Sequence, residues 1–253
     1  MYWILSVIWM LWLDGSGLSA TPETMGPSDL ADPADTLKIE KTADFPIKGN
    51  QEAQQWKKAE WIPLPLRSSN KQSAYAGTRE TRVKILYSES GIYFLFECKD
   101  RRLTATMKSD FSKLWKEDVV EVFLWPDTAE TAYLEYELSP LNFELPLLVS
   151  NEQGDKVRWR PFMYKGEQQT RHAVTVKGGS RKSGAQVEKW IAEIYIPFKL
   201  LRPLNNISPD PGTVWRANLY RVDYDLNKTQ YWAWQAVKSS FHEYSNFGYF
   251  SFQ

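Results

Sequence analysis

The chain has 253 residues, 43% of them hydrophobic and 25% charged, which is typical of a soluble globular protein with room for one large β domain or two small ones. Its 31 basic and 31 acidic residues cancel, so the sequence lacks the positive charge expected of a nucleic-acid-binding protein. A single Cys excludes a disulfide framework within the chain, and one Cys with two His argues against a zinc site.

The N-terminus is predicted to be an export signal over residues 1–20. Residues 2–13 are almost wholly apolar, a run of about a dozen against the ~20 needed to span a bilayer, and small residues ending at Ala20 follow it. Because no Lys or Arg precedes the run, an uncleaved anchor and a buried segment stay open as alternatives. Cleavage predicts a secreted, periplasmic or cell-surface protein without membrane attachment. Residues 21–36 hold three Pro with several Asp, Ser and Gly, which predicts a flexible leader.

Residues 37–253 are predicted to form one all-β domain. Residues 81–87 and 92–99 alternate in polarity or carry apolar residues on one face, and the turn pair Ser90-Gly91 between them predicts a hairpin. Further strands are predicted at residues 118–125, 133–138, 143–149, 172–176, 187–196, 214–222, 231–236 and 247–252. Regular strands separated by turn residues predict an antiparallel β-sandwich, jelly-roll or immunoglobulin-like, with few short helices.

Two details of packing follow from the same pattern. The early helix candidate, residues 52–59, contains Trp56, which we expect to close one end of the sandwich. Cys98 falls on the apolar face of its strand, where a small buried core residue is expected rather than a reactive thiol.

Two aromatic residues stand out because they lie in polar surroundings just before a strand, in a chain with 12 Trp. Trp115 precedes the strand that carries Glu121, and Glu121 alternates into a face with Val119 and Phe123. A carboxylate on such a face needs a partner or a ligand, since an unpaired buried carboxylate is costly. The alternative is that Trp115 caps a core edge and Glu121 pairs with an Arg.

The second aromatic residue is Phe241, in the polar loop before the terminal strand. An exposed ring in such a loop is a candidate for ligand stacking, and the alternative is that Phe241 folds back onto the sandwich.

Several segments together resemble family 9 carbohydrate-binding modules, particularly the subgroup found in secreted bacterial proteins. Residues 81–100 are similar to the family's T-x-V-x-L-L-Y … L-Y-V-x-F … D hairpin, and residues 115–123 to W-x-x-D-x-V-E-x-F. Residues 241–248 resemble F-H-x-P-x-x-F-G, and residues 215–221 the R-x-N-x-Y-R strand. The start of the domain, 50–61, fits x-x-W-x-x-A-x-W. The order and spacing of these segments carry the resemblance.

The resemblance implies a β-sandwich that binds sugar and catalyses nothing. In the family, two aromatic rings clamp a sugar ring while a strand Glu hydrogen-bonds its hydroxyls. Carried over by position, the rings are Trp115 and Phe241 and the carboxylate is Glu121. Asn218 and Arg221 are expected to add polar contacts. The partner is then a polysaccharide or oligosaccharide, bound by a monomer with no nucleic acid involved.

Two other functions compete with sugar binding. Catalysis by a pair of carboxyls would need two of them across a bond, and no Gly-x-Ser-x-Gly, phosphate loop or His-rich metal motif is present, so no enzyme is predicted. Related DOMON-type sandwiches hold haem, and a haem-binding or protein-interaction sandwich is the alternative function. The axial-ligand candidates for haem are His172, His242, Met107 and Met163.

No cofactor is expected, although family members also bind structural calcium. Loop oxygen ligands that suit calcium are available at Asp100, Asp118, Asp127 and Glu130, and no twelve-residue EF-hand loop is present. The metal site, if there is one, is left unassigned by the sequence.

Overall fold

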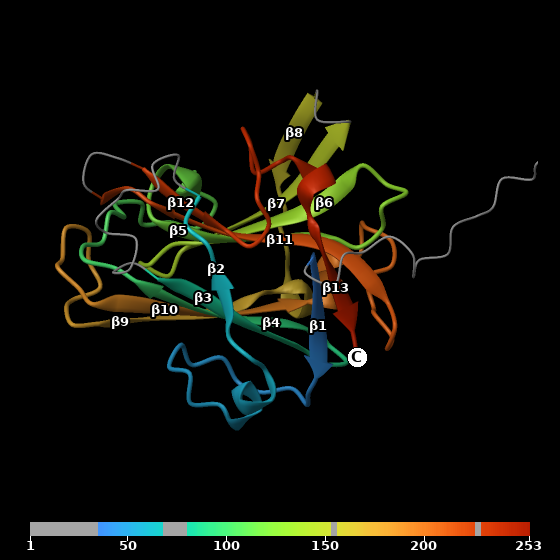
Figure 1. Cartoon of the computed structure of the whole chain (residues 1–253), viewed down its shortest axis with the longest axis horizontal. Coiled ribbons are helices and arrows are strands. Elements are labelled where there is room, and N and C mark those ends of the chain that lie inside the picture. The colour runs from blue at the N-terminus through green and yellow to red at the C-terminus, as the bar shows by residue number, and fades with distance from the viewer. Residues whose placement is uncertain (1–34, 68–79, 153–155, 226–228) are drawn as a thin grey trace, which may run out of the picture. The chain divides into compact units, whose positions relative to one another are not determined.

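A computed structural model describes residues 35–67, 80–152, 156–225 and 229–253. The predicted signal (residues 1–20) and nearly all of the predicted leader (21–36) lie outside these residues. Within them, strands stack in two layers and the only helices are short 3-10 turns (Figure 1). The prediction of an all-β sandwich is therefore confirmed.

The first sheet runs in the order β8-β7-β6-β5-β11-β13-β1, with β12 beside β11. Its strands are β8 (Lys156–Pro161), β7 (Glu144–Glu152), β6 (Ala132–Leu138), β5 (Val119–Trp125), β11 (Val214–Asp223), β13 (Gly248–Phe252), β1 (Thr36–Lys41) and β12 (Gln230–Ala233). The second sheet runs β1-β3-β4-β10-β9, with β2 beside β3. Its remaining strands are β3 (Thr81–Tyr87), β4 (Gly91–Lys99), β10 (Lys189–Pro197), β9 (Arg171–Lys177) and β2 (Ile62–Leu64).

Strand β1 is the exception to antiparallel pairing. It runs parallel to β13 from Thr36 to Ile39 and parallel to β3 at Glu40 and Lys41, so it passes from the first sheet to the second. Every other strand pair among the described residues is antiparallel.

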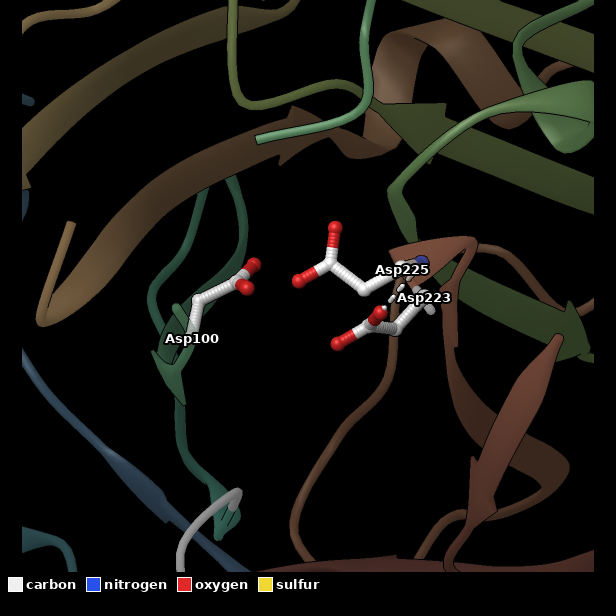
Figure 2. A group of neighbouring side chains, drawn as sticks. All are labelled: Asp100, Asp223 and Asp225. Atoms are coloured by element: carbon white, nitrogen blue, oxygen red, sulfur yellow. Dashed lines mark hydrogen bonds between the residues drawn. The ribbon is translucent and has the colours of Figure 1, made fainter. Parts of the chain in front are cut away.

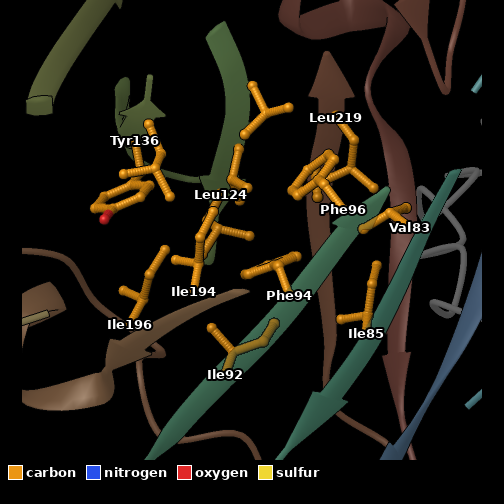
Figure 3. Packing of buried hydrophobic residues seen from close by; sticks show 14 of the residues in the cluster. Val83, Ile85, Ile92, Phe94, Phe96, Leu124, Tyr136, Ile194, Ile196 and Leu219 are labelled. Atoms are coloured by element: carbon orange, nitrogen blue, oxygen red, sulfur yellow. The ribbon is translucent and has the colours of Figure 1, made fainter. Parts of the chain in front are cut away.

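The main core lies between the two sheets, where the period of two along each strand places one set of side chains inward. Figure 3 shows this packing, in which residues of β3, β4 and β10, such as Phe94, Phe96 and Ile194, meet Leu124 of β5 and Leu219 of β11. Burying each such side chain contributes roughly 1.5–3 kcal/mol.

Cys98 is buried in the same core, as predicted. Burial raises the pKa of its thiol to about 12, because the thiolate would be desolvated there.

Each sheet also carries an apolar cluster on its outer face. On the second sheet, the 3-10 turn η2 (Gln54–Lys58) lays Trp56 over residues of β4 and β10 such as Tyr93 and Ile191. The indole nitrogen of Trp56 donates a hydrogen bond of 2.7 Å to the Glu193 carboxylate. The expectation that Trp56 closes one end of the sandwich is therefore wrong, because this hydrogen bond and its contacts place it on the outer face of a sheet.

The outer face of the first sheet is the one that matters for function. Inward residues of β5 such as Val120, Val122 and Leu124 join the main core, while Val119, Phe123 and Trp125 belong to the outer cluster. Loops and 3-10 turns that precede β5 and β13 pack over this face. Strands β1, β2 and β8 were not among the specific strands that the sequence predicted, and β8 extends this face by one strand.

Candidate functional site

A cavity of about 550 Å³ opens on the outer face of the first sheet. Three residues predicted from the sequence line it: Trp115, Glu121 and Phe241. They come from the turn before β5, from β5 itself and from the loop before β13. The fold thus brings together Trp115 and Phe241, which are 126 residues apart in sequence. The remaining lining residues are Arg67, Phe123, Glu135, Leu147, Trp159, Val222, Tyr224, Tyr231, Ala233, Val237, Lys238, Ser239, Ser240 and His242.

Trp115 belongs to the 3-10 turn η3 (Leu114–Lys116), whose Leu114 is buried in the outer cluster. The Tyr224 hydroxyl donates a hydrogen bond of 2.7 Å to the Trp115 carbonyl. The indole ring is half-buried and meets the Trp159 ring edge to face, with 5.4 Å between centroids. Trp115 is thus held at the cavity by its backbone and by a second indole ring.

The acidic residue that follows η3 holds this turn in place. The Glu117 carboxylate accepts hydrogen bonds from the backbone N–H groups of Thr106, at 2.5 Å, and of Met107, at 3.0 Å. Glu117 is therefore a support for the loop that carries Trp115 rather than a residue of the cavity.

Phe241 lies with its ring parallel to that of Tyr220, with 4.0 Å between centroids and 9° between planes. The Tyr220 hydroxyl also donates a 3.0 Å hydrogen bond to the Phe241 carbonyl. One face of the Phe241 ring is therefore covered by the sheet, which agrees with the alternative that Phe241 folds back onto the sandwich. The residue is nevertheless only half-buried and lines the cavity.

The loop that carries Phe241 is braced by the carboxylate of Glu243. This group accepts hydrogen bonds from the backbone N–H groups of Lys238, Ser239 and Ser240. These bonds stabilise the charged form and lower the pKa of Glu243 to about 2.

Two carboxyl groups, of Glu121 and Glu135, line the cavity, and a third, of the fully buried Glu137, lies behind them; we call the three the carboxyl cluster. Strand register places Glu121 of β5 opposite Glu137 of β6, and Phe123 opposite Glu135. All three side chains belong to residues that are no more than 5% exposed. Oε2 of Glu135 has no N–H or O–H donor within hydrogen-bond distance among the described residues, whereas the Glu137 carboxyl faces the Glu135 carboxyl and the backbone of Trp115.

The surroundings of the carboxyl cluster raise the pKa values of its three groups, which favours their protonated forms. Burial, together with the neighbouring carboxyls, raises the pKa of Glu121 and of Glu137 well above the usual range. Burial raises the pKa of Glu135 to about 7. No ion pair between Glu121 and an Arg exists in the described part of the chain, so the alternative partner considered from sequence is not found there.

We expect the stability of the protein to fall as the pH rises from about 4.5 to about 7. Because the pKa of Glu135 rises from 4.5 in the unfolded chain to about 7 in the folded chain, the folded state binds more protons in this window. This group alone is expected to cost roughly 1–3 kcal/mol of unfolding free energy above the window. Urea unfolding across the window measures the slope, and Glu135→Gln should flatten it, with the residual slope arising from other raised carboxyls. An unchanged slope in Glu135→Gln would contradict this assignment.

Asn218 and Arg221, predicted to add polar contacts, are not among the residues that line the cavity. Asn218 is buried beside it, where its amide nitrogen donates to the Tyr220 hydroxyl and the Gln235 carbonyl and its oxygen accepts from the Gln235 N–H. Arg221 is wholly buried and lies on the opposite face of β11, because odd and even residues of a strand point to opposite faces. The prediction for the position of Arg221 is therefore wrong.

Arg221 is the centre of a buried ion-pair network. Its Nη2 donates to Asp100 at 2.9 Å and to Asp223 at 3.0 Å, and its guanidinium lies 4.7 Å from the Trp232 ring centroid. Figure 2 shows the carboxyl groups of Asp100, Asp223 and Asp225 turned toward a common space.

The three carboxylates of Asp100, Asp223 and Asp225 are close enough together to be considered as a calcium site. Asp100 already accepts from the backbone N–H groups of Arg101 and Arg102 and from the indole of Trp190, besides Arg221. Because the Asp100 oxygens are taken by protein donors and Arg221 supplies the countercharge, this group suits an internal ion pair better than a cation. Structural calcium elsewhere in the chain stays a prediction.

Three aromatic residues of the cavity, Trp159, Tyr224 and Tyr231, were missed by the sequence analysis. Trp159 of β8 is 45% exposed and Tyr231 of β12 is 42% exposed, which is unusual for such large rings. The signal for Trp159 was a Trp flanked by Arg158 and Arg160, alternation typical of a strand with one solvent-facing side.

The two His candidates for haem ligation contact polar protein groups. His242 lines the cavity, with Nδ1 2.7 Å from the Tyr133 hydroxyl and Nε2 3.9 Å from Glu135. His172 is 3.2 Å from Asn142 through Nδ1, and it does not line the cavity, nor do the two Met candidates.

Among the described residues, no helix has the length and apolar character needed to span a membrane.

Comparison with known proteins supports these observations. The model of a family described as carbohydrate family 9 binding domain-like matches residues 47–253. A protein of Arthroderma benhamiae named "Extracellular protein" is 28% identical over 148 residues, which cover 56% of this chain and 63% of that protein. The chain thus spans less than two thirds of the length of this relative.

Solved structures share the fold at low sequence identity. A candidate carbohydrate-binding protein from Bacteroides uniformis is 18% identical, with a TM-score of 0.70 over 87% of this chain and 99% of that one. A family 9 carbohydrate-binding module from Caldicellulosiruptor kristjanssonii in complex with cellotriose is 14% identical, with a TM-score of 0.59 over 86% and 93%. The same kind of module in complex with glucose is 15% identical, again with a TM-score of 0.59, over 86% and 95%.

Proposed function

Because the chain belongs to the carbohydrate family 9 binding domain-like family, we propose that its cavity holds a sugar ring between Trp115 and Phe241, with Glu121 as a hydrogen-bond partner. The family is one of non-catalytic binding domains, so the prediction that the matched residues are not an enzyme is confirmed. The observation that carries the proposal is that these three residues, distant in sequence, line one cavity.

The shape and lining of the cavity suit a sugar. A volume of about 550 Å³ falls within the roughly 300–1,000 Å³ of small-molecule sites. The C–H faces of a pyranose stack on flat aromatic rings, and Trp159 and Tyr231 offer two further exposed rings at the rim. The carboxyl cluster at the floor supplies acceptors for sugar hydroxyls.

The setting of the domain follows from the same proposal. A polysaccharide or oligosaccharide is met outside the cell, and the name of the A. benhamiae relative supports an exported protein. We propose that the domain acts as a monomer, secreted or held at the cell surface, without nucleic acid, and without membrane attachment once the predicted signal is removed.

The experiment is binding of residues 21–253 to a panel of glycans. Affinity electrophoresis in soluble xylan, β-glucan and mannan is expected to retard the protein, and calorimetry with glucose and cellotriose is expected to give saturable binding. If no polysaccharide retards the protein and a glycan array gives no hit, sugar binding fails. A Soret band in the purified protein would instead favour the haem-binding alternative.

A further inference from the structure

The carboxyl cluster presents more acceptors than the protein satisfies. Glu135 is 5% exposed, lines the cavity and has Oε2 without a donor among the described residues, while the fully buried Glu137 lies behind it. Glu121 lies on the neighbouring strand, directly opposite Glu137, and lines the cavity together with Glu135. Buried polar groups are almost always paired, so Oε2 of Glu135 indicates a donor that comes from a ligand in the cavity.

Two cationic side chains, Arg67 and Lys238, line the cavity, and neither forms an ion pair with the carboxyl cluster among the described residues. The Arg67 guanidinium is bound to the carbonyls of Ala233 and Trp234, at 3.2 and 2.7 Å. Lys238 is exposed on the rim loop. His242 is 3.9 Å from Glu135, and burial lowers the pKa of its ring, which favours the uncharged form. Glu121 and Glu135 therefore face the cavity without a Lys or Arg ion-pair partner in the described part of the chain.

The walls above the floor are aromatic. Trp115, Trp159, Tyr224, Tyr231 and Phe241 all line the cavity. Electron-rich ring faces attract cations, and they do so more strongly when water is excluded. Carboxyl groups below and rings around form a site suited to a positively charged ligand.

We propose that the cavity selects an amine-bearing sugar, a glucosamine unit of a β-1,4-linked chain. This inference rests on the proposed sugar-binding function. The ammonium group donates up to three hydrogen bonds to the carboxyl cluster while the pyranose face stacks on the aromatic wall. A hydroxyl at the same position donates one hydrogen bond and carries no charge.

The test uses three trimers that differ only in the group at the second carbon of each sugar ring. These are glucosamine trimer with an amine, N-acetylglucosamine trimer with a neutral amide, and cellotriose with a hydroxyl. Calorimetry with residues 21–253, below the pKa of the sugar amine, is expected to show the glucosamine trimer binding at least tenfold more tightly than either neutral trimer.

A second readout follows protons. Because the pKa of Glu135 is raised to about 7 in the free protein, binding of an ammonium ion is expected to expel protons near that pH, whereas binding of cellotriose is not. Heats measured in two buffers of different ionisation enthalpy give the number released. The measured proton release also includes any response of the other titratable and charged groups around the cluster. These groups are Arg67, Tyr133, Tyr220, Tyr224, Tyr231, Lys238 and His242.

Two matched variants separate a local effect from a general charge effect. Glu135→Gln keeps the shape of the side chain and is expected to reduce the preference for the amine over the hydroxyl at least fivefold. Glu60→Gln removes an exposed carboxylate between η2 and β2 and is expected to keep the wild-type preference.

The outcomes distinguish this inference from the proposed function. Equal binding of all three trimers, or an equal gain for the acetylated trimer, would overturn recognition of the charge while leaving sugar binding intact. An unchanged preference in Glu135→Gln would also overturn it. Binding of none of the trimers, with no retardation by any polysaccharide, would remove the proposed function as well.

Discussion

Replacing Arg221 with alanine is expected to lower the free energy of unfolding by about 3–5 kcal/mol, because it leaves two buried carboxylates without their countercharge. Arg221 is wholly buried, and its Nη2 is 2.9 Å from Asp100 and 3.0 Å from Asp223. Its Nη1 also donates to the Thr81 hydroxyl and the Lys99 carbonyl, so the truncation removes ties between the two sheets.

The measurement is urea unfolding of the wild type and Arg221→Ala under matched conditions. Arg160→Ala, an exposed Arg of β8, is the control and is expected to change stability by less than about 0.5 kcal/mol. Adding Asp100→Asn and Asp223→Asn to Arg221→Ala is expected to recover part of the loss, since the unpaired charges are then gone. A loss below about 1 kcal/mol in Arg221→Ala would show that the network contributes little to stability.

Replacing Trp115 with alanine is expected to cost about 2 kcal/mol or more of sugar-binding free energy, as truncation of an aromatic hot spot does. The ring is half-buried at the cavity and contacts Trp159 edge to face, so its loss removes a wall and loosens a second one. Because Trp115 makes few contacts in the core between the sheets, unfolding free energy is expected to change by less than about 2 kcal/mol.

The control for Trp115→Ala is Trp61→Ala. Trp61 is also half-buried, but it packs on the outer cluster of the second sheet, with Arg82 4.2 Å from its ring centroid. A thermal melt and affinity electrophoresis are run side by side on both variants. If Trp115→Ala lowers the melting temperature strongly and binds normally when folded, the indole is a structural cap and not part of the site.

Most of the fold was predictable because strands have a short-range signature. Alternation placed β3 at residues 81–87, with the same bounds in the structure, and placed Cys98 in the core. Of the missed strands, β2 has only three residues. Strands β1 and β8 do alternate, with Leu37 and Ile39 of β1 between polar residues and the apolar Val157 and Trp159 of β8 between charged ones, and this signal was overlooked. Trp56 is buried, as predicted, but it covers the outer face of the second sheet and not an end of the sandwich. A pattern that indicates burial does not reveal which surface of the domain the side chain covers.

The sequence by itself determined that Trp115, Glu121 and Phe241 are candidates for one site, through motif order and the alternation that turns Glu121 outward with Phe123. Only the tertiary structure decided what accompanies them. Which strands lie side by side depends on long-range register, and that register set Glu137 opposite Glu121, with Glu135 beside them. It also brought Trp159 from β8 to the cavity and turned Arg221 into the interior, because a single residue of offset along β11 reverses the face that a side chain meets.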